Sequence, residues 1–121
     1  MPRPRILVVD DHPDIVEYFL FYLRQKGFRL AWAYDGVTAL ALAKVTKPDL
    51  VLLNIQMPRI NGIQALRELR EDPRTRGMKV ILMSGYANVG EMAKENGAQD
   101  YLAYPARYED VGVKVDRVLA A

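Results

Sequence analysis

Five short apolar segments alternate along this chain with five segments of helical pattern, and this alternation is the feature that most limits how it folds. The predicted strands cover residues 5–10, 28–34, 49–55, 79–83 and 100–104, and the predicted helices cover residues 13–26, 36–47, 62–70, 89–95 and 107–119. A repeat of this kind predicts a doubly wound α/β fold, in which helices cover both faces of a five-stranded parallel sheet. Residues 6–9 and 50–53 are apolar without interruption, which is typical of central strands buried on both faces.

The length of the chain limits the number of domains. Its 121 residues, of which 50% are hydrophobic, suffice for one core, so we expect a single domain over residues 1–121.

Gly90 is expected to weaken the fourth helix by about 1 kcal/mol relative to alanine. The charged residues 71–77 predict an exposed loop.

Composition excludes several classes of site and partner. The chain has no cysteine and one histidine, His12, which excludes disulfides, thiol nucleophiles and His-rich metal sites. The 17 basic and 15 acidic residues are interspersed, so we expect no direct nucleic-acid binding. No apolar run reaches the length of a membrane span or forms a signal-peptide core, and we expect a cytoplasmic protein with no membrane contact.

Polar side chains follow the ends of the predicted strands, where a doubly wound sheet places its ligand site. They are Asp10 and Asp11, Asn54, Ser84, and Tyr104 with Pro105. Adjacent carboxylates such as Asp10 and Asp11 are ligands that Mg²⁺ accepts. They serve equally well as an acidic cap on the helix that begins at Pro13, because the helix dipole favours negative charge there.

The segments around these residues form a recognisable set. They are ILVVDD (6–11), PDLVLLNIQMP (48–58), NG (61–62), VILMS (80–84) and GAQDYLAYP (97–105). In this order they resemble the receiver domain of bacterial two-component response regulators, over essentially the whole chain. The resemblance implies the flavodoxin-like strand order 2-1-3-4-5 and a cis peptide bond before Pro105. It also implies a phosphorelay, in which a histidine kinase passes a phosphoryl group to an aspartate at the end of the third strand.

Several positions take a role from this resemblance. Asp10 and Asp11 match the Mg²⁺-binding acidic pair, and the backbone carbonyl of Gln56 matches a further metal ligand. Ser84 matches the hydroxyl that hydrogen-bonds the phosphoryl group, and Tyr101 matches an aromatic switch position. Both also have plainer interpretations, because Ser84 can be an ordinary strand-end hydroxyl and Tyr101 a half-buried strand aromatic.

Two positions depart from the family pattern. The phosphoacceptor position holds Asn54, whose neutral carboxamide is a poor nucleophile. The position of the phosphate-binding lysine holds Tyr104, whose hydroxyl carries no positive charge. Since one acid and one base are lost together, the formal charge of the pocket is unchanged and the pocket can still bind Mg²⁺. Because one carboxylate ligand has become an amide carbonyl, we expect this binding to be weaker than in a conventional receiver.

The predicted function is therefore protein–protein signalling without phosphorylation and without enzyme activity. The expected partner is a histidine kinase, a phosphotransfer protein or another signalling protein, or a second copy of the chain. On the first helix Phe21 falls between Glu17 and Gln25 on the polar side, with Leu20 flanking it. We predict a partner surface at Leu20 and Phe21; a single tolerated surface aromatic is the alternative.

Three other functions are compatible with the same fold. A conventional phosphoacceptor receiver requires Asn54 to have been introduced by engineering, which leaves Tyr104 unexplained. A flavodoxin-like or nucleotide-binding protein needs a phosphate loop after the first strand, where Asp10 and Asp11 would repel a phosphate. A phosphatase with a strand-end aspartate nucleophile needs a nucleophile-x-acid spacing that Asp10 and Asp11 lack.

Overall fold

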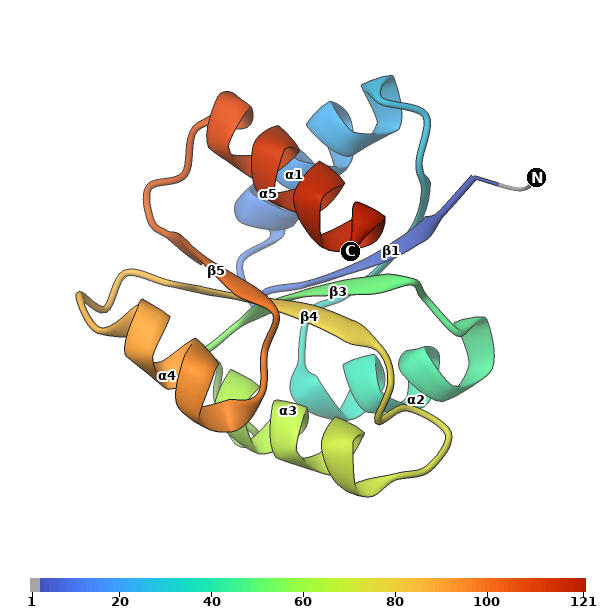
Figure 1. Ribbon diagram of the computed structural model, residues 1–121, viewed down its shortest axis with the longest axis vertical. Helices are drawn as coiled ribbons and strands as arrows, with labels where there is room; N and C mark the ends of the chain where they lie inside the picture. Colours follow the sequence, from blue (N-terminus) through green and yellow to red (C-terminus); the bar gives the residue numbers. More distant parts are fainter. Residues whose placement is uncertain (1–2) are drawn as a thin grey trace.

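The structure is a computed structural model that describes residues 3–121, and it has a parallel sheet between two layers of helices (Figure 1). The strands are β1 (Arg5–Val9), β2 (Arg29–Ala33), β3 (Leu50–Asn54), β4 (Lys79–Ser84) and β5 (Asp100–Ala103). The helices are α1 (Pro13–Gln25), α2 (Gly36–Thr46), α3 (Gly62–Glu71), α4 (Val89–Asn96) and α5 (Tyr108–Ala120). The predicted strand order is confirmed, because the sheet runs β2-β1-β3-β4-β5 with every pair parallel.

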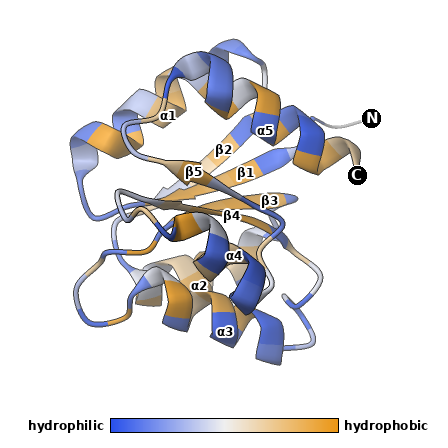
Figure 2. Ribbon diagram, turned by 60° about the vertical axis from the view of Figure 1, so that its left-hand side comes forward, coloured by the Kyte–Doolittle hydropathy of each residue, from blue (hydrophilic) through white to orange (hydrophobic). Residues whose placement is uncertain are grey.

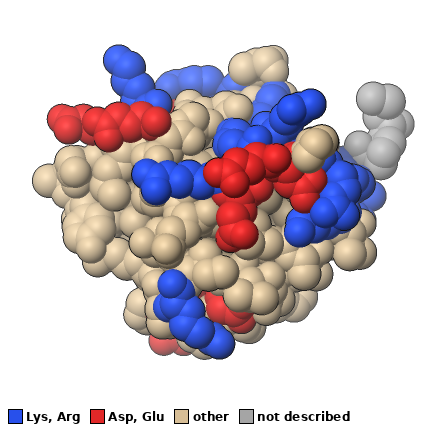
Figure 3. All heavy atoms as spheres, turned by 90° about the horizontal axis from the view of Figure 1, so that it is seen from below, with Lys and Arg blue, Asp and Glu red and all other residues tan. Residues whose placement is uncertain are grey.

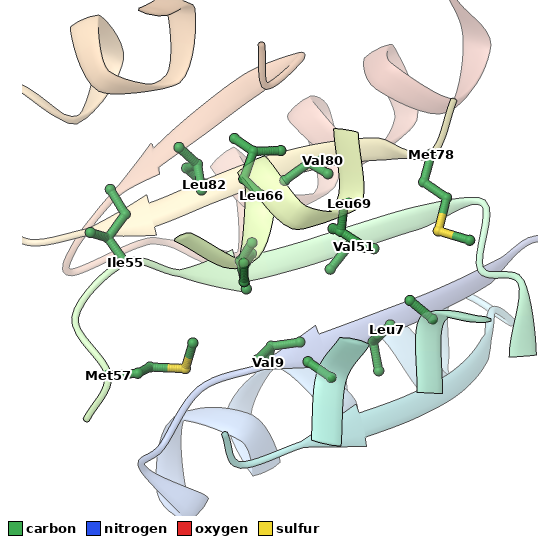
Figure 4. Packing of buried hydrophobic residues seen from close by; sticks show 14 of the residues in the cluster. Leu7, Val9, Val51, Ile55, Met57, Leu66, Leu69, Met78, Val80 and Leu82 are labelled. Carbon is green, nitrogen blue, oxygen red and sulfur yellow. The ribbon is translucent and has the colours of Figure 1, made fainter. Parts of the chain in front are cut away.

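Two apolar cores lie on the two faces of the sheet. Alternate residues of β1 enter different cores: Ile6 and Val8 pack with α1 and α5, whereas Leu7 and Val9 pack with α2 and α3. Figure 2 shows the strands at the centre as the most hydrophobic part of the fold. Figure 4 shows the core that contains Leu7 and Val9, with Leu66 and Leu69 of α3 next to the strand residues Leu82, Val80 and Val51. The uninterrupted apolar runs of β1 and β3 are therefore explained by burial on both faces.

The predicted elements are all present, and each boundary lies within one residue of its prediction. Gly27 ends α1 in the left-handed conformation that glycine adopts without strain, with φ of 87°. The prediction of an exposed loop at residues 71–77 is wrong for Thr75, which is buried and whose hydroxyl donates to the carbonyl of Leu69 (2.7 Å). Among residues 3–121, no helix is long and apolar enough to cross a membrane.

The parallel strands bring their carboxyl ends to one edge of the sheet. Asn54 of β3 pairs with Met83 of β4, and Ser84 of β4 pairs with Ala103 of β5. Asp10 follows β1, and its backbone N–H donates to Ala33 at the end of β2 (3.2 Å). The polar residues singled out after the strands are thereby gathered at one place.

Candidate acidic site

Asp10 is the most deeply buried charged residue of this site, and both of its carboxylate oxygens have partners. Its side chain is 0% exposed. Oδ1 accepts from the backbone N–H of His12 (2.9 Å) and lies 3.0 Å from the His12 ring nitrogen Nδ1. Oδ2 accepts from the hydroxyl of Tyr104 (2.8 Å). The chain itself therefore supplies the donors that a buried carboxylate needs.

Asp11 has a buried carboxylate oxygen without a hydrogen bond. Its Oδ1 is buried and lies 3.1 Å from His12 Nδ1, outside hydrogen-bonding geometry. Ligand atoms of Asp10, Asp11 and His12 all lie within 4.8 Å of one another. The free carboxylate oxygen fits a divalent cation, which prefers oxygen ligands. Asp11 is therefore the residue of the site that remains most available to a metal ion.

His12 is a member of the site that the sequence reasoning set aside. The hydrogen bond to Asp10 raises the pKa of His12 above 6.5, and the charges of Asp11 and Asp10 raise it further. Its position next to Asp10 and Asp11 in the sequence was the available signal. The exclusion of a His-rich metal site does not apply to a single histidine that lies against two carboxylates.

Asn54 ends β3 and is 3% exposed. Its Nδ2 donates to the backbone carbonyl of Gln56 (2.9 Å), the group that the family resemblance assigns to the metal. The carboxamide thus occupies this carbonyl with its own N–H group. A carboxylate at position 54 could not do so, because it has no donor.

The close approach of α3 to β3 fixes this part of the site. Gly62, the first residue of α3, leaves no room for a Cβ, since that atom would fall within 2.8 Å of the Ile55 Cα. Its N–H donates to the Ile55 carbonyl (2.8 Å). Asn61 and Gln64 close a reciprocal capping box at the start of α3. These local contacts explain the Asn-Gly pair of the sequence pattern and hold the loop that carries Gln56.

Ser84 is fully buried at the end of β4. Its Oγ accepts from the backbone N–H of Tyr86 (2.9 Å), so the oxygen holds the turn that leads to α4. Tyr101, by contrast, lies on the edge strand β5 with 38% of its side chain exposed. The structure therefore brings Ser84 to the acidic edge and leaves Tyr101 on the outer surface.

Tyr104 occupies the position after β5. Its N–H donates to the Ser84 carbonyl (2.9 Å), and its hydroxyl reaches Asp10 across the sheet edge. Burial raises the pKa of the Tyr104 hydroxyl far above 10, and the charge of Asp10 adds to the effect, so the phenol is neutral. The expected cis peptide bond between Tyr104 and Pro105 is confirmed.

The prediction of a surface position for Leu20 is wrong. Leu20 is 1% exposed and packs in the core beneath α1 and α5, whereas Phe21 is 59% exposed as predicted. Leu20 comes one helical turn after the buried Val16, so it shares the face that meets the sheet. Of the predicted partner surface, Phe21 alone remains.

An apolar groove that the sequence did not predict lies between the start of α1 and the segment after β5. It is lined by Asp14, Ile15, Tyr18, Phe19, Tyr104, Pro105 and Ala106. The hydroxyl of Tyr18 donates to the Ala106 carbonyl (2.9 Å), and the Tyr18 ring stacks on Tyr108 with centroids 4.7 Å apart. Tyr104 therefore belongs to the wall of this groove as well as to the acidic site.

Comparison with known proteins agrees with this arrangement. Residues 6–116 match a model of the response regulator receiver domain. The chain is 36% identical over 118 residues to Protein PilH of Pseudomonas aeruginosa, covering 96% of this chain and 98% of PilH. It is also 36% identical over 115 residues to the DNA-binding response regulator MtrA of Mycolicibacterium smegmatis, covering 93% of this chain. The chain spans only 49% of the length of MtrA.

Solved structures show the same similarity. The N-terminal domain of a response regulator receiver protein from Methanoculleus marisnigri superposes with a TM-score of 0.79 and 35% identity, covering 98% of each chain. The receiver domain of the sensor histidine kinase PA1611 from Pseudomonas aeruginosa superposes with a TM-score of 0.89 and 26% identity, covering 98% of this chain and 99% of that one. That structure has a magnesium ion coordinated in its active site cleft.

Proposed function

The chain belongs to the response regulator receiver domain family of two-component signalling, and we propose that it is an atypical member that takes up no phosphoryl group and signals through protein contacts. The observation that carries this proposal is the presence and bonding of Asn54 at the phosphoacceptor position. Asn54 presents a carboxamide where the family transfers the phosphoryl group, and its Nδ2 is bonded to the Gln56 carbonyl. A neutral amide is not a nucleophile for acyl phosphate formation.

The phenol at position 104 supports the same conclusion. A lysine there would present an ammonium group to a phosphoryl oxygen, whereas Tyr104 presents a neutral hydroxyl that Asp10 already uses (2.8 Å). A phosphoryl group at this edge would therefore add negative charge beside Asp10 and Asp11 with no lysine to offset it. Both departures remove the same step, which argues against an isolated engineered change at Asn54.

A weak Mg²⁺ site is part of the proposal. Asp11 would hold the ion through its free Oδ1, with Asp10 beside it and the carboxamide oxygen of Asn54 in place of a third carboxylate. The Gln56 carbonyl is a poorer ligand here because Asn54 already donates to it. When bound, the ion would supply positive charge that offsets the two acids. We expect weaker binding than in a receiver with three carboxylates.

The surface that a signalling partner would contact includes Phe21 and the apolar groove beside α1. A histidine kinase or phosphotransfer protein is the partner class we propose, and a second copy of the chain is the other candidate. Basic and acidic side chains lie side by side on the face drawn in Figure 3, which offers nucleic acid no one-sided positive field. We further propose a cytoplasmic, non-catalytic module whose residues 1–121 act as one domain.

The proposal is tested by incubating the purified chain with acetyl phosphate and Mg²⁺ and measuring its intact mass. No phosphoryl adduct is expected on the unmodified chain, and Asn54→Asp alone should label poorly because Tyr104 remains. The double variant Asn54→Asp/Tyr104→Lys should label well. An adduct on the unmodified chain would overturn the proposal, and full labelling of Asn54→Asp alone would favour a conventional receiver altered at one position.

A further inference from the structure

Helix α4 is held at its first turn by the ring of Tyr101. Gly90 has no side chain, and the Tyr101 ring lies so close that a Cβ there would fall 3.1 Å from Cε1 and 3.2 Å from Cζ. Ordinary Cβ contacts are longer, so the ring rests directly on the backbone of α4. Gly90 lowers the helix propensity of α4, and its missing side chain allows this close contact between α4 and β5.

Lys114 of α5 holds the same ring from another side. Its Nζ lies 3.8 Å from the centroid of the Tyr101 ring, which is a cation–π contact. The same Nζ lies 3.2 Å from Oδ1 of Asp100 and donates to the Tyr101 carbonyl. Asp100 Oδ1 also accepts from the Tyr101 N–H (2.8 Å). Three elements, α4, β5 and α5, are therefore joined through one aromatic side chain.

Arg70 of α3 holds the other end of α4. Its Nη2 and Nε donate to the carbonyl of Gly97, the residue that ends α4, at 2.9 and 3.2 Å. Its Nη1 donates to the carbonyls of Met78 (2.7 Å) and Arg76 (3.0 Å). Burial lowers the pKa of Arg70, and the groups that it bonds are neutral and offer no negative charge to oppose this effect. The guanidinium therefore ties the end of α4 to the start of β4.

Among residues 3–121, no side-chain hydrogen bond joins the acidic site to Tyr101, Lys114 or Arg70. Within residues 3–121 the Tyr101 hydroxyl makes no hydrogen bond, and the Ser84 oxygen is bonded to the Tyr86 backbone rather than to Tyr101. The ring of Tyr101 therefore takes its position from Gly90 and Lys114.

We propose that α4 is fixed at both ends, by Tyr101 and Lys114 at Gly90 and by Arg70 at Gly97, so that the α4–β5–α5 surface has one conformation whatever the state of the acidic site. The proposal rests on the proposed function, since it describes how that module presents its surface. It names Gly90, Lys114 and Arg70 as positioning residues. The contacts at the two ends of α4 come from different elements, β5 and α5 at Gly90 and α3 at Gly97.

The first test uses Asn54→Asp/Tyr104→Lys with acetyl phosphate and Mg²⁺, followed by NMR of the full chain. The Tyr101 ring signals and the ring-current shift of the Lys114 methylenes should be the same with and without the phosphoryl group. Movement of these signals upon labelling would overturn the inference while leaving the proposed function intact. Labelling of the unmodified chain would overturn the proposed function instead, and intact mass separates the two outcomes.

The second test needs no phosphorylation and measures amide hydrogen exchange in α4. Lys114→Met keeps the aliphatic stem but removes the cation–π contact, the ion pair with Asp100 and the hydrogen bond to the Tyr101 carbonyl. It should therefore speed exchange near the start of α4 at least threefold, the size of the cation–π contact alone. Arg70→Met should speed exchange at the last turn by more, because several hydrogen bonds are lost. Lys94→Met, on the exposed side of α4, is the matched control and should change neither. Equal exchange in Lys114→Met and Lys94→Met would refute the role of Lys114.

Discussion

The hydroxyl of Tyr104 is the single group whose removal tests the interior of the acidic site most directly. Tyr104→Phe deletes one oxygen and keeps the ring that lines the groove. The lost bond joins a phenol to a carboxylate at 2.8 Å, and that carboxylate is 0% exposed. A hydrogen bond to a charged group contributes about 2 kcal/mol, and here no solvent replaces the lost donor.

We therefore expect Tyr104→Phe to lower the free energy of unfolding by about 2 kcal/mol, which moves the midpoint of urea denaturation by about 1 M. Tyr108→Phe is the control, because Tyr108 is exposed and its hydroxyl makes no hydrogen bond within residues 3–121. That variant should stay within about 0.5 kcal/mol of the unmodified chain. If both variants unfold at the same urea concentration, Asp10 does not depend on Tyr104 and our account of the site is wrong.

Three further predictions concern the rest of the fold. Leu20→Ala should lower the free energy of unfolding by about 3 kcal/mol because it leaves a cavity in the core, whereas Phe21→Ala should change it by less than about 0.5 kcal/mol. Equal losses of stability in thermal denaturation would contradict the assignment of the buried and exposed faces of α1. Arg59 has a φ of 66°, a conformation that is strained for arginine and not for glycine, so Arg59→Gly should raise the free energy of unfolding by about 0.5 kcal/mol. A lower free energy of unfolding in the same assay would show that contacts of the Arg59 side chain outweigh its backbone strain. The side-chain hydrogen bond from Arg74 lowers the pKa of Asp72 to about 2, so this carboxylate stabilises the fold above pH 4 and loses that effect as the pH falls toward 2. Asp72→Asn should therefore reduce the loss of unfolding free energy between pH 4 and pH 2. An unchanged loss over this pH range would show that the Arg74–Asp72 contact does not stabilise the fold.

The sequence pattern was sufficient to predict the fold. The continuous apolar runs of β1 and β3 identify the centre of the sheet because such strands are buried on both faces. The position of Leu20 was missed because α1 packs against the sheet and also against α5, where Tyr18 and Tyr22 stack on Tyr108. A helix with two neighbours has a wider buried arc than a single stripe of apolar residues indicates.

The candidate site was predicted only in outline. The rule that strand ends gather at one edge placed Asp10, Asn54, Ser84 and Tyr104 in the same region. It gave no indication that the Tyr104 hydroxyl reaches a carboxylate 94 residues earlier, or that the Asn54 amide bonds the Gln56 carbonyl. These contacts depend on side-chain rotamers that only the packed structure determines.

The fixed position of α4 has a consequence for affinity. A receiver that switches offers its binding-competent surface only in the fraction of molecules that occupy the active conformation, and its apparent affinity falls by that fraction. At a population of about 1%, a partner binds about a hundredfold more weakly than it would to the competent state alone. With Arg70 and Tyr101 holding α4, all molecules present the same surface. Occupancy by a partner would then follow the concentration of this chain in the cell, so that its synthesis and degradation would carry the signal.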